Sequence, residues 1–195
     1  MKKRILFLLT VLLIAVITTS TVSAGGNVGL TRLAFKPTSS GGTTTLMLVS
    51  TSESFMDSLA ATGKLTGLGG YKQGVRVELA ASGDPVVSCS NQSGNEAPGQ
   101  NPSRISADGN QFVGPQDITK NGTAPMGVTA VPEPITATEG GCPNDNWTAQ
   151  IVSVDWTNAE IFVLDAATDK ELLHRKYTCD PEKQTDTEVI CTETK

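Results

Sequence analysis

Apolar and polar positions alternate along several short segments of the chain, and this two-residue period predicts β-strands. In residues 75–80 every second side chain is apolar, so one face of the strand is expected to be buried. A three-stranded meander is predicted further on, with strands at residues 150–156, 159–164 and 172–179 and turns at Thr157-Asn158 and residues 165–170.

Short strand-like segments recur through the rest of the chain from residue 28 onward. Further strands are predicted at residues 28–36, 43–50, 59–66, 85–90, 118–120, 126–131 and 189–191. Asn121-Gly122 is expected to form a two-residue turn, because both residues accept positive φ. Residues 52–60 are expected to hold a helical turn, and residues 91–104 and 132–146, rich in Gly, Pro and Asn, are predicted to be irregular. Roughly ten short strands predict an all-β domain, an antiparallel β-sandwich of immunoglobulin-like or jelly-roll type.

The N-terminus has the three-part pattern of a secretory signal peptide. Lys2, Lys3 and Arg4 precede an apolar run, and Val22-Ser23-Ala24 forms a small-residue cleavage site. The apolar run of about 13 residues is shorter than the roughly 20 that a membrane-spanning helix needs. We expect a signal peptide at residues 1–24, a single secreted domain at residues 25–195 and no membrane anchor after cleavage. The expected location is extracellular, periplasmic or in the cell envelope.

Charge narrows the range of partners. The leader contains three of the 15 basic residues and none of the 20 acidic ones, which leaves the mature chain with a formal charge of −8. No cluster of Lys and Arg is visible along the sequence of the mature chain. An acidic surface repels phosphate backbones, so nucleic acid is not an expected partner.

All four cysteines fall in the mature part, which predicts two disulfides in an oxidising compartment. Three pairings are possible. We favour Cys179 with Cys191, because a short polar segment between two predicted strands can turn back on itself. That choice leaves Cys89 with Cys142. A zinc site would need closer cysteine pairs than these.

Catalytic and cofactor motifs are absent from the sequence: it contains no H-E-x-x-H, P-loop or G-x-G-x-x-G pattern. His174, the only histidine, lies in a predicted strand without a nucleophile motif nearby, so we expect it to be exposed. Asp108-Gly109-Asn110 and Asn144-Asp145-Asn146 offer oxygen ligands in predicted loops, at lower density than a calcium loop has. We therefore predict no catalytic residues, no cofactor and no metal.

Candidate binding residues come from aromatic side chains and one loop. Tyr71 and Trp147 lie in predicted loops, where exposed rings can stack on sugars, whereas Trp156 is expected in the core. The loop at residues 91–104 contributes Asn95, Glu96 and Gln100 as hydrogen-bonding groups, and loops on a rigid scaffold often bind partners. The expected partner is a protein or a glycan.

Three segments resemble a group of secreted bacterial β-sandwich proteins. They are GKLTGLG at residues 63–69, the run from Cys89 through GNEAPGQNP at residues 94–102, and CPNDNW at residues 142–147. The group has no established activity or catalytic residues to transfer, and the resemblance implies Cys89–Cys142 as a shared disulfide. The expected function is a secreted, non-enzymatic structural or interaction protein. A glycan-binding module is the first alternative, and a carboxylate-based hydrolase, whose catalytic pair has no fixed sequence spacing, is the second.

Overall fold

The computed structural model describes residues 27–38 and 57–194, and regular structure in this part of the chain is almost entirely β-strand. The strands are β1 (Gly29–Thr38), β2 (Ser58–Thr66), β3 (Val75–Asn91), β4 (Glu96–Pro98), β5 (Ile105–Val113), β6 (Ala124–Pro132), β7 (Trp147–Asp165), β8 (Glu171–Cys179) and β9 (Cys191–Thr194). Three 3₁₀ turns lie between them, η1 (Leu68–Gly70), η2 (Pro115–Asp117) and η3 (Pro181–Lys183). The predicted all-β class is confirmed.

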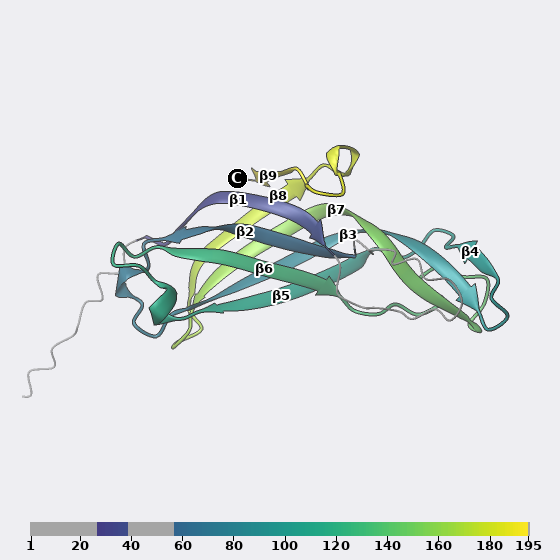
Figure 1. Cartoon of the computed structure of the whole chain (residues 1–195), viewed down its shortest axis with the longest axis horizontal. Coiled ribbons are helices and arrows are strands. Elements are labelled where there is room, and N and C mark those ends of the chain that lie inside the picture. Colours follow the sequence, from purple (N-terminus) through teal and green to yellow (C-terminus); the bar gives the residue numbers. More distant parts are fainter. Residues whose placement is uncertain (1–26, 39–56, 195) are drawn as a thin grey trace, which may run out of the picture.

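The strands form one antiparallel sheet in the order β1-β2-β6-β5-β3-β7-β8-β9, with β4 paired to β3. The segment before β9 returns to the first strand, since the Val189 amide donates to the Phe35 carbonyl (3.0 Å). The sheet is therefore curled into a nearly closed tube (Figure 1). We call β1, β2 and β6 the short arm of this sheet, and β3, β5, β7 and β8 the long arm.

The two arms meet at a narrow junction. Only two residue pairs, Ala107 with Pro132 and Asp108 with Val131, join β5 to β6. Gly109 permits this geometry, because a Cβ at that position would overlap the backbone oxygen of Thr129 on β6. The prediction that Asp108-Gly109-Asn110 forms a loop is therefore wrong: these residues lie in β5, which we did not predict as a strand.

Apolar side chains from both arms fill the tube. The largest that are fully buried are Leu59, Leu65, Leu68, Leu79, Ile161 and Trp156. Burying a side chain of this size contributes about 1.5–3 kcal/mol relative to leaving it in water. The alternation predicted for residues 75–80 is confirmed, since Val75 and Val77 join Leu79 in this core. The core position of Trp156 is confirmed as well.

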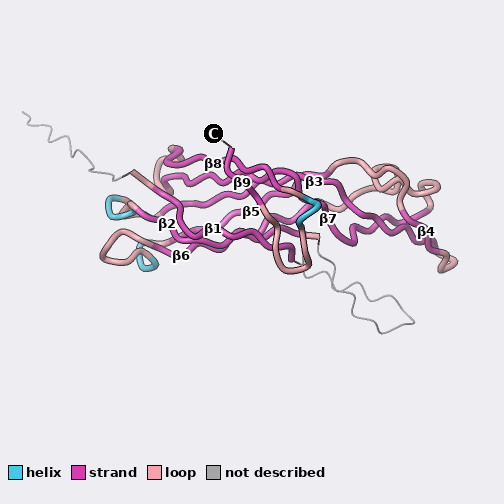
Figure 2. The backbone as a smooth tube through the Cα atoms, turned by 90° about the horizontal axis from the view of Figure 1, so that it is seen from above, coloured by secondary structure: helices cyan, strands magenta, loops and turns pink. Residues whose placement is uncertain are grey.

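Two strands are longer than predicted. Thr157-Asn158 is not a turn, because β7 runs through it to Asp165. Likewise the predicted strands at residues 75–80 and 85–90 are one strand, β3. Beyond the end of the tube, β3 and β7 continue side by side as a narrow extension that also contains β4 (Figure 2).

Of the other predicted strands and turns, some agree with the structure and others do not. The strands predicted at residues 28–36, 59–66 and 172–179 correspond to β1, β2 and β8, and the turn at residues 165–170 is confirmed. Residues 118–120 form a turn rather than a strand, and Ser58–Ala60, predicted as helical, begins β2. The irregular stretch at 91–104 contains the short strand β4. The strand predicted at residues 43–50 lies outside the described residues.

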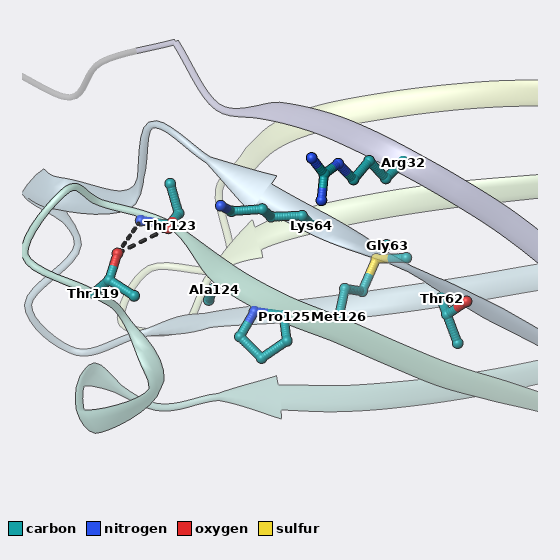
Figure 3. A pocket seen from close by; sticks show the side chains of 9 residues that line it. All are labelled: Arg32, Thr62, Gly63, Lys64, Thr119, Thr123, Ala124, Pro125 and Met126. Carbon is teal, nitrogen blue, oxygen red and sulfur yellow. Dashed lines mark hydrogen bonds between the residues drawn. The ribbon is translucent and has the colours of Figure 1, made fainter.

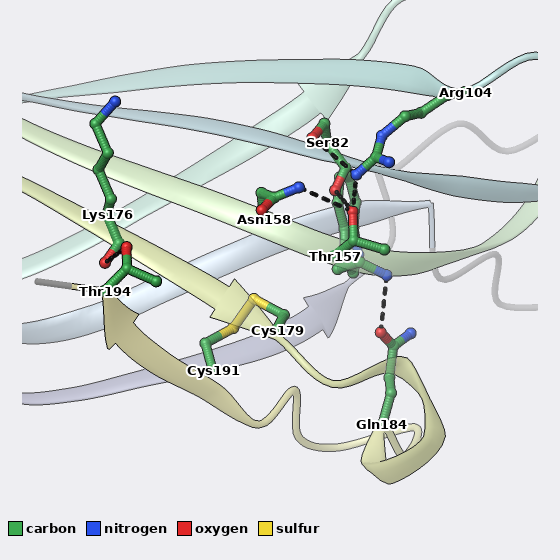
Figure 4. The surroundings of a disulfide bond; sticks show 10 residues. Ser82, Arg104, Thr157, Asn158, Lys176, Cys179, Gln184, Cys191 and Thr194 are labelled. Carbon is green, nitrogen blue, oxygen red and sulfur yellow. Dashed lines mark hydrogen bonds between the residues drawn. A yellow bond between two sulfur atoms is a disulfide. The ribbon is translucent and has the colours of Figure 1, made fainter.

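Both disulfides are confirmed, as Cys89–Cys142 and Cys179–Cys191. The second disulfide closes the β8–β9 hairpin, and the η3 turn between its two cysteines lies beside the long arm (Figure 4). There the side chain of Gln184 accepts from the Trp156 amide (3.1 Å) and donates to the Val154 carbonyl (2.6 Å). A side-chain amide thus bonds to the edge of β7 beyond its last pair with β8.

Candidate functional site

A shallow groove of about 530 Å³ crosses the outer face of the short arm (Figure 3). Arg32 of β1 and Lys64 of β2 line it on one side, and Met126 of β6 contributes part of its apolar surface. The loop before β6 bounds one end with Thr119 and Thr123. The groove therefore combines two cations with hydroxyl groups and a small apolar area.

A β-bulge places Arg32 at this groove. Thr31 pairs with Lys64 and Ala34 with Thr62, so Arg32 and Leu33 together lie opposite Gly63. Arg32 has a φ of 54°, the left-handed conformation that L-residues other than Gly seldom adopt. Gly63 has no side chain where a Cβ would come within 3.3 Å of the Thr31 carbonyl, so β1 can approach β2 closely here. Bulges of this kind redirect a side chain, in this case the guanidinium of Arg32.

Thr119 and Thr123, which we call the threonine rim of the groove, are held in place by hydrogen bonds within their own turn. The hydroxyls of Thr119 and Thr123 lie 2.8 Å apart, and the Thr123 amide donates to the Thr119 hydroxyl (3.2 Å). Gly122 has a φ of 67° and its carbonyl accepts from the Leu68 amide (2.9 Å). The turn predicted at Asn121-Gly122 is therefore present, and it docks the rim on η1.

Charge is divided unevenly between the two arms. The three strands of the short arm contain Arg32, Lys36 and Lys64 and no Asp or Glu, whereas the four strands of the long arm contain seven acidic and three basic residues. Arg32, Lys36 and Lys64 are all exposed, and none forms an ion pair with a residue that the structure describes. These cations form no cluster along the sequence, because the pairing of β1 with β2 brings together Arg32 and Lys64, which are 32 positions apart.

The predicted binding residues do not form one site. Tyr71 follows η1, to which its amide bonds (3.0 Å to the Leu68 carbonyl), and its ring packs partly buried against the core. Trp147 begins β7 in the extension, opposite Asn91 of β3. The η1 turn and the extension with β4 lie at opposite ends of the molecule (Figure 1). The two rings therefore do not form a common platform.

The predicted loop residues share the extension with Trp147. Asn95, Glu96 and Gln100 are exposed, and Glu96 belongs to β4. The loop is ordered by its backbone: the Gly99 amide donates to the Val87 carbonyl (2.8 Å) and the Gln100 amide to the Gly141 carbonyl (2.9 Å). Together with the Cys89–Cys142 disulfide, these bonds fasten the loop to β3 on one side and to residues 132–146 on the other.

A second pocket, of about 380 Å³, lies on the outer face of the long arm. Glu78, Asp108, Asn110 and Phe162 line it. The ring of Phe162 also stacks on His174, with centroids 4.1 Å apart. The pocket thus offers an aromatic edge beside oxygen acceptors.

His174 is less exposed than predicted, because it is held between two neighbours. Besides stacking on Phe162, its Nε2 lies 2.8 Å from Oε2 of Glu160, and this hydrogen bond is the main reason that the pKa of Glu160 is below its ordinary value. Lys176, 3.3 Å from the same carboxylate, lowers that pKa further. The contacts of His174 are thus the Phe162 ring and the Glu160 carboxylate, and the same carboxylate is ion-paired with Lys176.

The described residues contain no group of three His, Cys, Asp or Glu side chains close enough to hold a metal ion. In the segment Asn144-Asp145-Asn146, whose oxygens are possible calcium ligands on sequence grounds, Asp145 accepts a hydrogen bond from the Thr138 hydroxyl (2.9 Å). Within residues 27–38 and 57–194, no helix has the length and hydrophobicity of a membrane span.

Comparison with known proteins adds no relative: no family model, curated protein or solved structure matches this chain.

Proposed function

We propose that the mature chain is an exported, non-enzymatic interaction protein of the cell envelope or extracellular space, and that the short-arm groove is its binding surface. The observation that supports this most is the pair of cations Arg32 and Lys64, which have no ion-pair partner among the described residues and lie together in a groove on the sheet. Two disulfides agree with an oxidising compartment, where such bonds form and persist. The signal peptide at residues 1–24 supplies the route of export in this proposal.

For the fold, we propose the finer description of a two-layered sandwich, with the short arm as one layer and the long arm as the other. The two-pair junction of β5 and β6 supports it, since so narrow a link resembles a strand crossing between layers. The choice between an immunoglobulin-like and a jelly-roll type stays a prediction.

A glycan-binding module that takes neutral sugars is the second candidate, favoured by the pocket on the long arm. Phe162 lies there beside Glu78, Asp108 and Asn110, and aromatic rings beside oxygen acceptors suit a neutral sugar. Phe112, on the same strand as Asp108, is 59% exposed. A carboxylate-based hydrolase ranks below both, because Glu78 forms an ion pair with Arg76 (2.7 Å) and Asp108 is exposed.

An array of glycans and peptides probed with the protein of residues 25–195 tests the proposal. We expect Thr62→Trp, which fills the groove, to abolish binding, and Ser106→Trp, an exposed position on the long arm, to preserve it. Loss of binding with Ala80→Trp, in the long-arm pocket, and not with Thr62→Trp would favour the glycan module instead. Shortened glycans in the eluate would show that the protein is a hydrolase.

A further inference from the structure

We propose that the short-arm groove binds an anionic polysaccharide, whose carboxylate, sulfate or phosphate groups pair with Arg32 and Lys64 in the groove and with Lys36 further along β1. This inference rests on the proposed function and specifies the class of ligand. It starts from the contrast between two sets of cations.

Among the described residues, the three cations in the strands of the long arm are all ion-paired, whereas Lys72, Arg104, Lys120 and Lys170, which lie in turns and loops, are not. Arg76 pairs with Glu78, Arg175 with Glu193 (2.6 Å), and Lys183 with Asp180 (2.7 Å). Arg32, Lys36 and Lys64 have no such partner, although the mature chain has an excess of eight acidic residues. Like charges gathered on one face repel each other, and a bound anion relieves that repulsion. The face is therefore complementary to a ligand that carries several negative charges.

The spacing of the cations favours a polymer over a small ion. Arg32 lies opposite Gly63 and Lys36 opposite Ala60, so the two cations are three β2 positions apart, which corresponds to about 10 Å along an extended strand. Lys64 lies beside them on β2, paired with Thr31. The three charges therefore extend over more than the width of one sugar ring. A chain with a charge on successive sugars could contact all of them.

The surface between the cations suits a saccharide chain. Ala34 pairs with Thr62, which pairs in turn with Gly127 on β6. These small side chains leave the strand face flat, and a Cβ at Gly127 would meet nothing within 4 Å. The exposed hydroxyl of Thr62 can donate to or accept from sugar hydroxyls.

Nucleic acid and membrane surfaces fit this face less well. Single-stranded nucleic acids are bound through aromatic platforms, and the one aromatic residue in the short-arm strands, Phe35, is buried. Insertion into a membrane needs a protruding apolar face, which Thr62, Lys64 and Gly127 do not provide.

The test is isothermal titration of the protein of residues 25–195 with polygalacturonate, dextran sulfate, polyphosphate, duplex DNA, anionic vesicles and neutral dextran, at about 20 mM and about 0.3 M salt. Two double variants are compared with the unmodified protein. The groove variant combines Arg32→Asn with Lys64→Gln. The control variant combines Lys72→Gln with Lys170→Gln, at exposed positions outside the groove. Asn is chosen because it accepts the left-handed conformation of residue 32. Lys64→Gln alone leaves the bulge intact and serves if the double variant folds poorly.

We expect the unmodified protein to bind polygalacturonate or dextran sulfate and not neutral dextran. The groove variant should bind about tenfold more weakly, equivalent to about 1.4 kcal/mol, whereas the control should bind within about twofold. High salt should weaken binding by a similar factor. A preference for carboxylate over sulfate polymers, or the reverse, would identify the anionic group.

Equal weakening in the groove variant and the control would overturn the inference, because net charge alone would then explain binding. Absence of binding to every polyanion, tighter binding to polyphosphate, duplex DNA or anionic vesicles than to any polysaccharide, or equally tight binding to neutral dextran would also overturn it. If Thr62→Trp abolishes binding to a neutral array ligand while the charge variants do not, the groove proposal stands and the anionic class is wrong.

Discussion

At the scale of single residues, the absence of a side chain at two glycines allows neighbouring strands to approach each other closely. Gly63 lets the bulge of β1 approach β2, which directs the Arg32 side chain over the groove. Gly109 lets β6 cross close above β5 at the junction of the two arms. Both act through the space that a Cβ would occupy, and neither has a positive φ.

Gly109→Ala should therefore be strongly destabilising. The new Cβ would overlap the Thr129 carbonyl oxygen, and because backbone cannot move aside cheaply we expect a loss of about 2–3 kcal/mol in the free energy of unfolding. Gly127→Ala is the matched control, since its Cβ meets nothing within 4 Å, and it should change stability by about 0.5 kcal/mol or less. Urea denaturation measures both. Equal midpoints for the two variants would contradict this account of the junction.

Residue patterns do not predict side chains that replace strand hydrogen bonds. Gln184 does so at the edge of β7, and Gln111 accepts from the Gly127 amide (2.8 Å), linking β5 to β6 beyond their two paired positions. A glutamine in a polar segment has no signal that distinguishes this role from ordinary exposure.

At the scale of elements, the sequence predicts strands well where alternation is uninterrupted, as in β1, β2 and β8. It fails where turn-forming residues lie inside a paired strand. Gly83-Asp84-Pro85 and Thr157-Asn158 resemble turns, yet β3 and β7 pair through them with a shifted register between Ser82 and Gly83. Long-range pairing thus overrides local preference. The same conflict hides β5, whose centre is Asp108-Gly109-Asn110.

A replacement within the loop at residues 91–104 tests whether the role of this loop is structural. Replacing residues 95–100 with a flexible Gly/Ser linker keeps the backbone donors but is expected to disorder them, so that the pairing of β4 with β3 and the bonds from Gly99 to Val87 and from Gln100 to Gly141 are lost. With each hydrogen bond worth about 1 kcal/mol, we expect a loss of about 2–4 kcal/mol and unchanged ligand affinity. Thermal unfolding and titration of the same samples measure both. Lost binding with an unchanged melting temperature would place the site in this loop, as the sequence first suggested.

At the scale of the whole molecule, the curled sheet determines where a ligand can bind. Trp156, Leu59 and Ile161 occupy the interior between the arms, so the grooves lie on outer faces. The overall acidic charge conceals a cationic face, because closing the sheet separates the short arm from the acidic strands of the long arm. Composition alone predicts the net charge but not this separation. The site was missed for the same reason: its residues come together only when β1 pairs with β2.

The groove as the binding surface is the central claim, and amide chemical-shift mapping tests it most directly. A uniformly ¹⁵N-labelled protein of residues 25–195 would be titrated with a short oligogalacturonide. We predict the largest shifts at Arg32, Thr62 and Lys64, extending along β1 to Lys36. Shifts concentrated instead around Phe162 in the long-arm pocket, or around Trp147 and residues 95–100 in the extension, would contradict the account.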